Sequence, residues 1–286
     1  MSDPAIGAIP RPRARRIPWS ASGAIGAVLV GAILLFVVAG PLIWQVDPNA
    51  QSLIKALQSA SPQHPLGTDD QGRDQLARLM AGGRVSLGIG IGSMLIGLAL
   101  GSALGLVAAV KRGWIEAICL RLIDALLALP GIVQAVILAA VIGRGVGPLI
   151  LALGIYSTPI FARVTYTAAR QVMTQDYISA VQLFGASTLR IVLRHVLPNI
   201  VTPLMAIGTL RIGSNILTGA ALNFFGLGVQ PPGAEWGLMI ADGRAFSWDQ
   251  PMLLILPGIA LFLTGVGFNL LGDGLRDWLD PHSRAR

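Results

Sequence analysis

Long uninterrupted apolar segments constrain the fold of this chain more than any other feature of its sequence. Six of them occur, near residues 19–44, 85–110, 115–142, 147–169, 200–225 and 252–272. A membrane β-strand needs only about 9–11 residues, whereas an apolar helix that crosses a bilayer needs about 20, which matches these lengths. Charged residues make up 12% of the chain, and soluble domains contain about 25%. The sequence therefore predicts an all-α polytopic membrane protein with six transmembrane helices.

The N-terminal end has the layout of a retained membrane helix. Residues 1–18 form a basic leader with the run RPRARR, and the first transmembrane helix is expected over residues 19–44. The apolar run of a secretory signal spans only about 7–15 residues, so removal as a signal is not expected. Trp19 and Trp44 bracket the segment at the depths where interfacial aromatic side chains lie.

Basic residues indicate how the helices are oriented. If the leader is cytoplasmic, so is the tail, residues 273–286, and 12 of the 21 lysines and arginines fall in cytoplasmic segments, against 6 in outside loops. Four of those six lie in the one long outside loop, residues 45–84. Cytoplasmic loops collect Lys and Arg, so we expect both termini in the cytoplasm. Membrane topology also explains the formal charge of +7, and we expect no nucleic-acid partner.

The sequence lacks the residue patterns of an enzyme or a metal site. Its two lysines, Lys55 and Lys111, do not lie in a G-x-x-x-x-G-K-[ST] phosphate loop, and the three histidines form no H-E-x-x-H pair. The single cysteine, Cys119, excludes an internal disulfide and a cysteine-rich metal site. We therefore expect no catalytic residue, metal or cofactor in this chain. Without such a phosphate loop, we expect no ATP hydrolysis by this chain itself.

The segment between the fourth and fifth apolar runs predicts a cytoplasmic hairpin of two short amphipathic helices, residues 176–198. Asp176 is a good N-cap for the first helix, Gly185 ends it, and Ser187 caps the second, which Pro198 is expected to end. Helices this short are marginal alone, so each apolar face must pack on this protein's own helix ends or the membrane, or in a groove of a cytoplasmic partner. Apolar residues with helical spacing are Tyr177, Ala180, Val181 and Phe184, then Leu189, Val192, Leu193 and Val196.

The same segment resembles the EAA loop of ABC importer permeases, in which EAA is followed by three residues, glycine, nine residues and I-x-L-P. Ser179, Val181 and His195 replace the usual Glu, second Ala and Ile. Three further stretches resemble the outside loops and the C-terminal ending of the dipeptide, oligopeptide and nickel permeases, in particular the DppC/OppC type: His64–Asp74, Asn223–Ile240 and Phe268–Pro281.

The resemblance implies a type I ABC importer permease architecture with a five-helix core at residues 85–272. It also implies a second related permease subunit, two ATPase subunits that bind ATP and Mg, and an external solute-binding protein, together in the inner membrane. The commonest cargo of such permeases is a di- or oligopeptide, and a nickel complex, glutathione or another small solute is the alternative. The ATPase-coupling residues that the match implies are Tyr177, Ser179, Ala180, Val181, Phe184, Gly185, Ala186, Leu189, His195, Leu197 and Pro198.

A secondary transporter or channel is the rival interpretation, because such proteins place ionisable groups in the membrane. Arg121 and Asp124 lie three residues apart and are expected to pair. Arg211 lies deep in the fifth apolar segment, with Asn215 one turn further on. Both are candidates for the translocation path, or for hydrogen bonds to a neighbouring helix. No acid lies at the same depth, so a proton relay is not expected.

Glycines and prolines predict how the membrane helices pack and bend. Gly97, Gly101 and Gly105 form a small-xxx-small ridge, which lets two membrane helices approach closely. Pro130 and Pro159 are expected to kink or break their helices.

Overall fold

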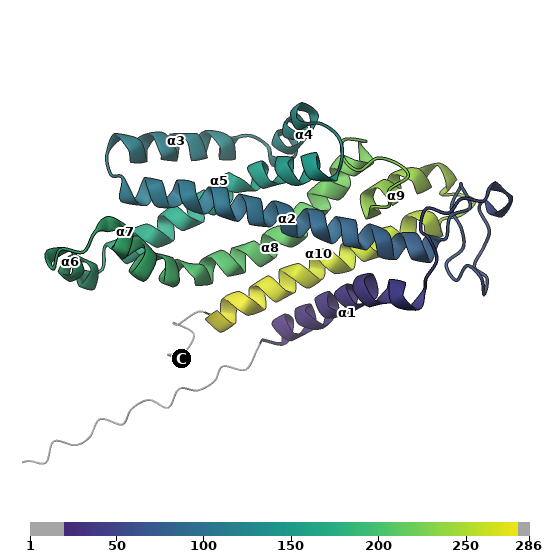
Figure 1. Cartoon of the computed structure of the whole chain (residues 1–286), viewed down its shortest axis with the longest axis horizontal. Helices are drawn as coiled ribbons and strands as arrows, with labels where there is room; N and C mark the ends of the chain where they lie inside the picture. The colour runs from purple at the N-terminus through teal and green to yellow at the C-terminus, as the bar shows by residue number, and fades with distance from the viewer. Residues whose placement is uncertain (1–19, 280–286) are drawn as a thin grey trace, which may run out of the picture.

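The computed structural model describes residues 20–279, and within them the chain is helical almost throughout (Figure 1). The long helices run roughly side by side along the longest axis of the molecule. Their bounds are α1 Ala21–Ile43, α2 Gln75–Val110, α3 Trp114–Ala128, α4 Gly131–Ile142, α5 Val146–Met173, α6 Asp176–Leu183, α7 Thr188–Ile191, α8 Leu197–Phe224, α9 Trp236–Gly243 and α10 Met252–Leu279.

The predicted six-helix membrane fold is confirmed. Helices α1, α2, α5 and α10 are each long and apolar enough to cross a membrane, as is α8 together with the helical turns that precede it. Helices α3 and α4 form a sixth span with a bend of 99° between them. The bend lies at Leu129 and Pro130, as the sequence predicts, because proline pushes the residue before it into extended backbone. Leu129 has that extended conformation.

The expectation for the second proline is wrong in part, because Pro159 does not break its helix. Helix α5 continues through it from Val146 to Met173. Proline removes one backbone donor and crowds the preceding turn. The carbonyl that loses its donor is that of Ile155, four residues earlier. Membrane helices tolerate proline when neighbouring helices or local adjustments of the backbone satisfy such a carbonyl.

The last ten residues of the expected outside loop, 75–84, are the start of helix α2, so the stretch between α1 and α2 is residues 44–74. Asp74 caps the helix by accepting a hydrogen bond from the amide of Ala77 at 2.7 Å. Polar residues early in the helix find partners in the protein, which allows the helix to extend beyond the apolar run. The Arg84 guanidinium, for example, donates to the carbonyl of Val37 on α1 at 2.9 Å.

Helix α10 continues to Leu279, and so into residues 273–286, the expected cytoplasmic tail. Gly274 in this last stretch lies against Gly23 of α1, and an added Cβ at either would meet the other's backbone within 3 Å. The packing against α1 extends the helix past its apolar run. The basic leader, residues 1–18, and the remainder of the tail lie outside the described residues.

The glycine ridge of α2 packs on α5 as the sequence predicts. A Cβ at Gly101 would lie 2.5 Å from the carbonyl oxygen of Thr158, and one at Gly105 would lie 2.5 Å from that of Ala162. Only glycine permits this separation of the two backbones. Close packing of this kind holds membrane helices together where no hydrophobic force draws them out of lipid.

The connections divide between the two ends of the bundle (Figure 1). The α2–α3 turn, helix α6, helix α7 and the end of α10 lie at one end, to the left in this view. Helix α9 and the loop before α2 lie at the other. The same alternation is predicted from the basic residues, with the α6–α7 end as the cytoplasmic one.

Candidate functional site

The hairpin between α5 and α8 is the candidate coupling site, and its first half has nearly the predicted form. Helix α6 begins at Asp176, but Gln175 occupies the N-cap position, so Asp176 contributes a charge in the first turn instead of a cap. A carboxylate there suits the positive end of the helix dipole. Ser187 is an N-cap, as predicted, because its hydroxyl accepts from the amide of Arg190 at 3.4 Å.

Gly185 ends α6 in a Schellman motif, the helix end that leaves one residue in the left-handed region. Its φ is +80°, the conformation predicted from its position. Its amide donates to the carbonyl of Gln182 at 2.9 Å, and the amide of Ala186 donates to that of Val181 at 3.3 Å. Val181 and Ala186 also pack against the same apolar cluster, which supplies the hydrophobic contact typical of this motif.

The expectation that Pro198 ends the second helix is wrong. The second helix continues without a break from α7 through a π-helical turn, Val192–Val196, into α8. Pro198 is the second residue of α8. Proline is well tolerated in the first turn of a helix. The π-turn gives the chain one extra residue before the proline, and the amide of Leu197 accordingly donates to the carbonyl of Val192. The hairpin is therefore joined rigidly to a membrane helix.

One face of the hairpin is packed inside the protein. Ile178, Ile191 and Val196 are fully or almost fully buried in a cluster with Ala169 of α5. Val181, Ala186 and Leu197 pack on the edge of that cluster. The half-buried His195 lies against Tyr177, with ring centroids 6.0 Å apart and planes tilted by 58°. Part of the hairpin thus packs on the permease's own helix ends.

A second apolar face of the hairpin points away from the protein. Leu183 is 88% exposed and Phe184 is 91% exposed. The same face includes the exposed side chains of Tyr177, Leu189 and Leu193. Ser179 and Ala180 are also exposed. The predicted single face of the first helix is therefore split, because Val181 turns inward whereas Tyr177, Ala180 and Phe184 turn outward. The helical spacing did not select Leu183, since it lies between the chosen positions.

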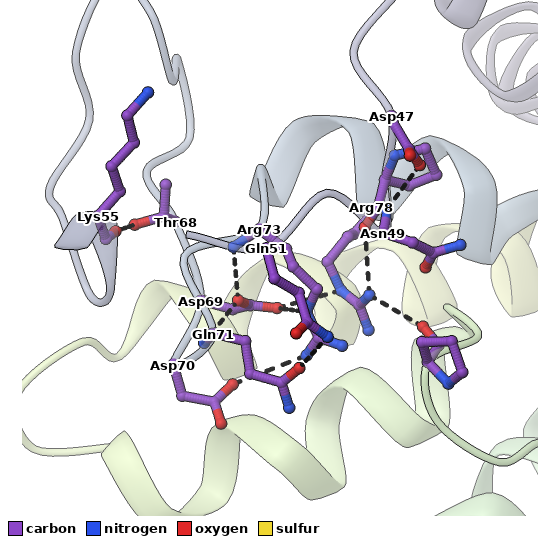
Figure 2. A network of polar contacts seen from close by, with 12 residues as sticks. Asp47, Asn49, Gln51, Lys55, Thr68, Asp69, Asp70, Gln71, Arg73 and Arg78 are labelled. Atoms are coloured by element: carbon purple, nitrogen blue, oxygen red, sulfur yellow. Dashed lines mark hydrogen bonds and ion pairs between the residues drawn. The ribbon is translucent and has the colours of Figure 1, made fainter. Parts of the chain in front are cut away.

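The opposite end of the bundle is held by a buried ionic network (Figure 2). The Arg73 and Arg78 side chains both reach Asp69, with Nε–Oδ2 distances of 2.6 Å and 3.3 Å, and all three residues are buried. Arg78 also donates to the carbonyls of Pro48 and Pro232, both at 3.3 Å. The first and last outside loops are thereby joined through one guanidinium. The stretch His64–Asp74, which carries the family resemblance, has this structural role here.

The second contact of that stretch centres on Asp74. Trp44, which follows α1, donates its indole N–H to one carboxylate oxygen at 3.0 Å. His64 Nδ1 lies 2.9 Å from the other oxygen. Because Asp74 also caps α2, the ends of two membrane helices and the loop between them meet at one carboxylate. His64 is partly buried here.

A buried glutamate, which the sequence interpretation missed, joins α9 to α2. Glu235 caps α9 by accepting from the amide of Leu238 at 2.9 Å, and it accepts from the Ser86 hydroxyl at 2.6 Å. Burial raises the pKa of this carboxyl above its ordinary value, and the hydrogen bond from Ser86 opposes that rise. Trp236 donates its indole N–H to the carbonyl of Leu79 at 2.8 Å. The sequence does contain a signal for this helix start, because the turn sequence PPG is followed closely by Glu235, an acidic residue that can cap a helix.

The candidate path residues differ in what they contact. Asn215 is fully buried and bonds two other helices, because it accepts from Ser157 of α5 at 3.0 Å and donates to Ser93 of α2 at 2.9 Å. This position favours the helix-linking alternative for Asn215 over a path-lining one. Arg211, one turn earlier, lies with its Cζ 5.4 Å from the centroid of the Tyr156 ring.

The predicted ion pair between Arg121 and Asp124 is replaced by another. Asp124 of α3 pairs with Arg163 of α5 instead. Neighbours on one helix face compete with residues of other helices, here with an arginine of α5. Within residues 20–279, no three His, Cys, Asp or Glu side chains are grouped as a metal site would require.

Comparisons with known proteins agree on one family. The model of the family described as "Binding-protein-dependent transport system inner membrane component" matches residues 101–285. The glutathione transport system permease protein GsiD of Pectobacterium atrosepticum is 42% identical over 228 residues, which cover 80% of this chain and 76% of that protein. GsiD of Escherichia coli is 40% identical over 252 residues, 87% of this chain and 83% of that protein.

A solved structure shows the same fold at low sequence identity. A chain of the MetNI methionine ABC transporter in an inward-facing conformation matches with a TM-score of 0.56 and 17% identity. The match covers 69% of this chain and 96% of that one. It supports the type I importer permease architecture that the sequence predicts.

Proposed function

From the premise that this chain belongs to the family of binding-protein-dependent transport system inner membrane components, we propose that it is the permease subunit that couples separate ATPase subunits to uptake of a short peptide. It forms half of a translocation path in the cell inner membrane. A second, related permease forms the other half, and an external solute-binding protein delivers the cargo. The ATPases bind ATP and Mg, and both termini of this chain lie in the cytoplasm.

The outward apolar face of the hairpin is the observation that carries the proposal. Leu183 and Phe184 are almost fully exposed in water at an end of the bundle where the polar hairpin replaces membrane helix. Burying one such side chain in a partner is worth about 1.5–3 kcal/mol. Amphipathic helices that present apolar residues in this way typically dock in a groove of another protein. An ATPase subunit is the partner that this family membership supplies.

The inward face explains how docking would be transmitted. The π-turn at Val192–Val196 joins the hairpin to α8 without a flexible linker, and Ile178 and Val196 anchor it on α5. A displacement of the docked hairpin therefore moves two membrane helices with it. The two faces favour docking on a partner over packing on this protein's own helices alone, since that packing leaves Leu183 and Phe184 unused.

Glutathione, itself a tripeptide, is the first cargo to test. Both permeases described above carry glutathione in their names, whereas the sequence interpretation favoured di- or oligopeptides generally. The measurement is uptake of radiolabelled glutathione and of a dipeptide by cells that express the complete set of subunits. Uptake of glutathione alone supports the narrower cargo, and uptake of the dipeptide alone replaces it.

Coupling is tested separately through the hairpin. Leu183→Asp and Phe184→Asp place a charge on the outward face, where the exposed side chains make folding insensitive to the change. We expect both variants to reach the membrane at normal levels and to recover less ATPase on co-purification. Ile178→Asp is the contrasting variant, because a charge at this buried position lowers the amount of folded subunit itself. Normal ATPase recovery by both outward variants would exclude this face as the docking site.

A further inference from the structure

Arg211 lies at the middle of a membrane helix. It occupies the fifteenth position of the 28 residues of α8, so each end of the helix is about 20 Å away at 1.5 Å per residue. That depth corresponds to the centre of a bilayer, where a charged side chain costs about 2.5–3.5 kcal/mol on insertion scales. An arginine is retained at such a depth when a partner, water or a ligand meets its charge.

The guanidinium of Arg211 lacks a hydrogen-bond partner within the described part of the chain. Its Nε and Nη2 atoms are buried and donate to nothing there. The Tyr156 ring contributes an attraction to the charge, with Cζ 5.4 Å from the ring centroid, but a ring face does not replace an acceptor for these donors. Arg163 of α5 differs, since it is paired with Asp124.

The surface beside Tyr156 is not suited to lipid. The Tyr156 hydroxyl reaches the first residue of α4, because a Cβ added to Gly131 would lie 2.8 Å from its oxygen. Helix α3 ends just before, at Ala128, and Leu129 and Pro130 are exposed on the surface of the subunit. Interrupted backbone at membrane depth is stable only where it is covered by protein or lines a water-filled cavity. This face of the subunit therefore borders a partner or an aqueous path.

We propose that Arg211, held beside Tyr156, is a transient binding site for a carboxylate of the cargo at the middle of the translocation path. An arginine donates two parallel hydrogen bonds to a carboxylate. Nε and Nη2 are closed off from solvent in this conformation, so they meet the cargo when the path opens during the transport cycle. Short peptides carry at least one carboxylate, and a single cation without a second clamp allows release. The inference rests on the proposed function and adds the chemical group that the path recognises. It also gives a role to the ring of Tyr156, which orients the guanidinium.

The test uses the complete transporter in proteoliposomes with its binding protein, and radiolabelled glutathione as the probe. We expect Arg211→Gln to lower uptake about tenfold or more, as loss of a charge-assisted hydrogen bond does, while the amount of assembled complex stays unchanged. Arg211→Lys keeps the charge and restores part of the uptake. The matched control is the double variant Arg163→Gln with Asp124→Asn, because it removes a membrane arginine together with the acid that pairs with it, and its uptake stays near that of the unmodified transporter.

Two results overturn the proposal. Unchanged uptake by Arg211→Gln shows that the cation does not act on cargo. Loss of the second permease from the purified complex in proportion to the loss of uptake assigns Arg211 to an acid of that subunit instead.

A labelling experiment remains decisive if glutathione is not the cargo. Arg211→Cys in a Cys119→Ser background should react with a water-soluble, anionic methanethiosulfonate during ATP turnover, because an aqueous path reaches this depth. Absence of reaction in every state of the cycle contradicts the site. Failure of the unmodified transporter to move glutathione, with reaction at position 211, overturns the cargo of the proposed function and leaves the site standing.

Discussion

A β-branched residue at Gly185 is expected to weaken ATPase docking without affecting the rest of the fold. Gly185 has φ of +80°, and an ideal Cβ built there meets no atom within 4 Å. The penalty of Gly185→Val is therefore conformational, about 1–2 kcal/mol for a left-handed backbone. If the chain leaves that conformation instead, it loses the two hydrogen bonds of the Schellman motif, each worth about 0.5–1.5 kcal/mol.

This penalty acts only on the direction of α6. A change of 1–2 kcal/mol lowers the ratio of correctly turned to misturned hairpin by a factor of about 5–30. The measurement is the amount of ATPase recovered per permease when the permease is limiting, together with thermal unfolding of the purified permease. Recovery should fall by up to that factor, whereas the melting temperature should fall by only a few degrees, because the strain is confined to one exposed residue at the end of the bundle.

Gly185→Asn is the matched control, since asparagine tolerates the left-handed region. It should recover more ATPase than the valine variant. Equal loss in the asparagine and valine variants, or normal recovery and transport in Gly185→Val, would refute the argument from backbone conformation.

Two further predictions concern topology and pH. In a Cys119→Ser background, Ile54→Cys should label only from outside the cell and Phe184→Cys only from the cytoplasm, because these exposed side chains lie at opposite ends of the bundle; the reverse pattern would invert the orientation. Burial raises the pKa of Glu235. At a pH between the ordinary glutamate pKa and this raised pKa, Glu235 is protonated in the folded state and ionised in the unfolded chain. Stability of the unmodified protein should fall as pH rises through that interval. Glu235→Gln should flatten this slope in thermal melts, and an unchanged slope would show that Glu235 is not its source.

Local sequence was sufficient for the features that depend on short stretches of chain. The lengths of the apolar segments determine the six-span fold, because a bilayer sets the length of a helix that crosses it. Gly185 and Ser187 mark the hairpin, since a left-handed turn and a helix cap each have few suitable residues. Pro130 breaks its helix for a similarly local reason.

The neighbours of each helix required the tertiary structure. Asp124 pairs with Arg163 instead of Arg121, which lies on its own helix. Asn215 is enclosed between two helices whose residues are 58 and 122 positions away in the chain. A segment that is apolar on all sides has no periodicity to show which side meets lipid and which meets protein.

The same division applies to the candidate site itself. The sequence identified the hairpin, but it did not show that Val181 turns inward while Leu183 and Phe184 remain free. It placed Arg211 deep in the membrane without showing that its donors lack partners. Spacing along a helix determines which residues share a face, whereas the packing of distant helices determines what that face meets. These contacts form only in the folded chain. They distinguish a surface that is free to dock or bind from one that already packs or bonds within the protein.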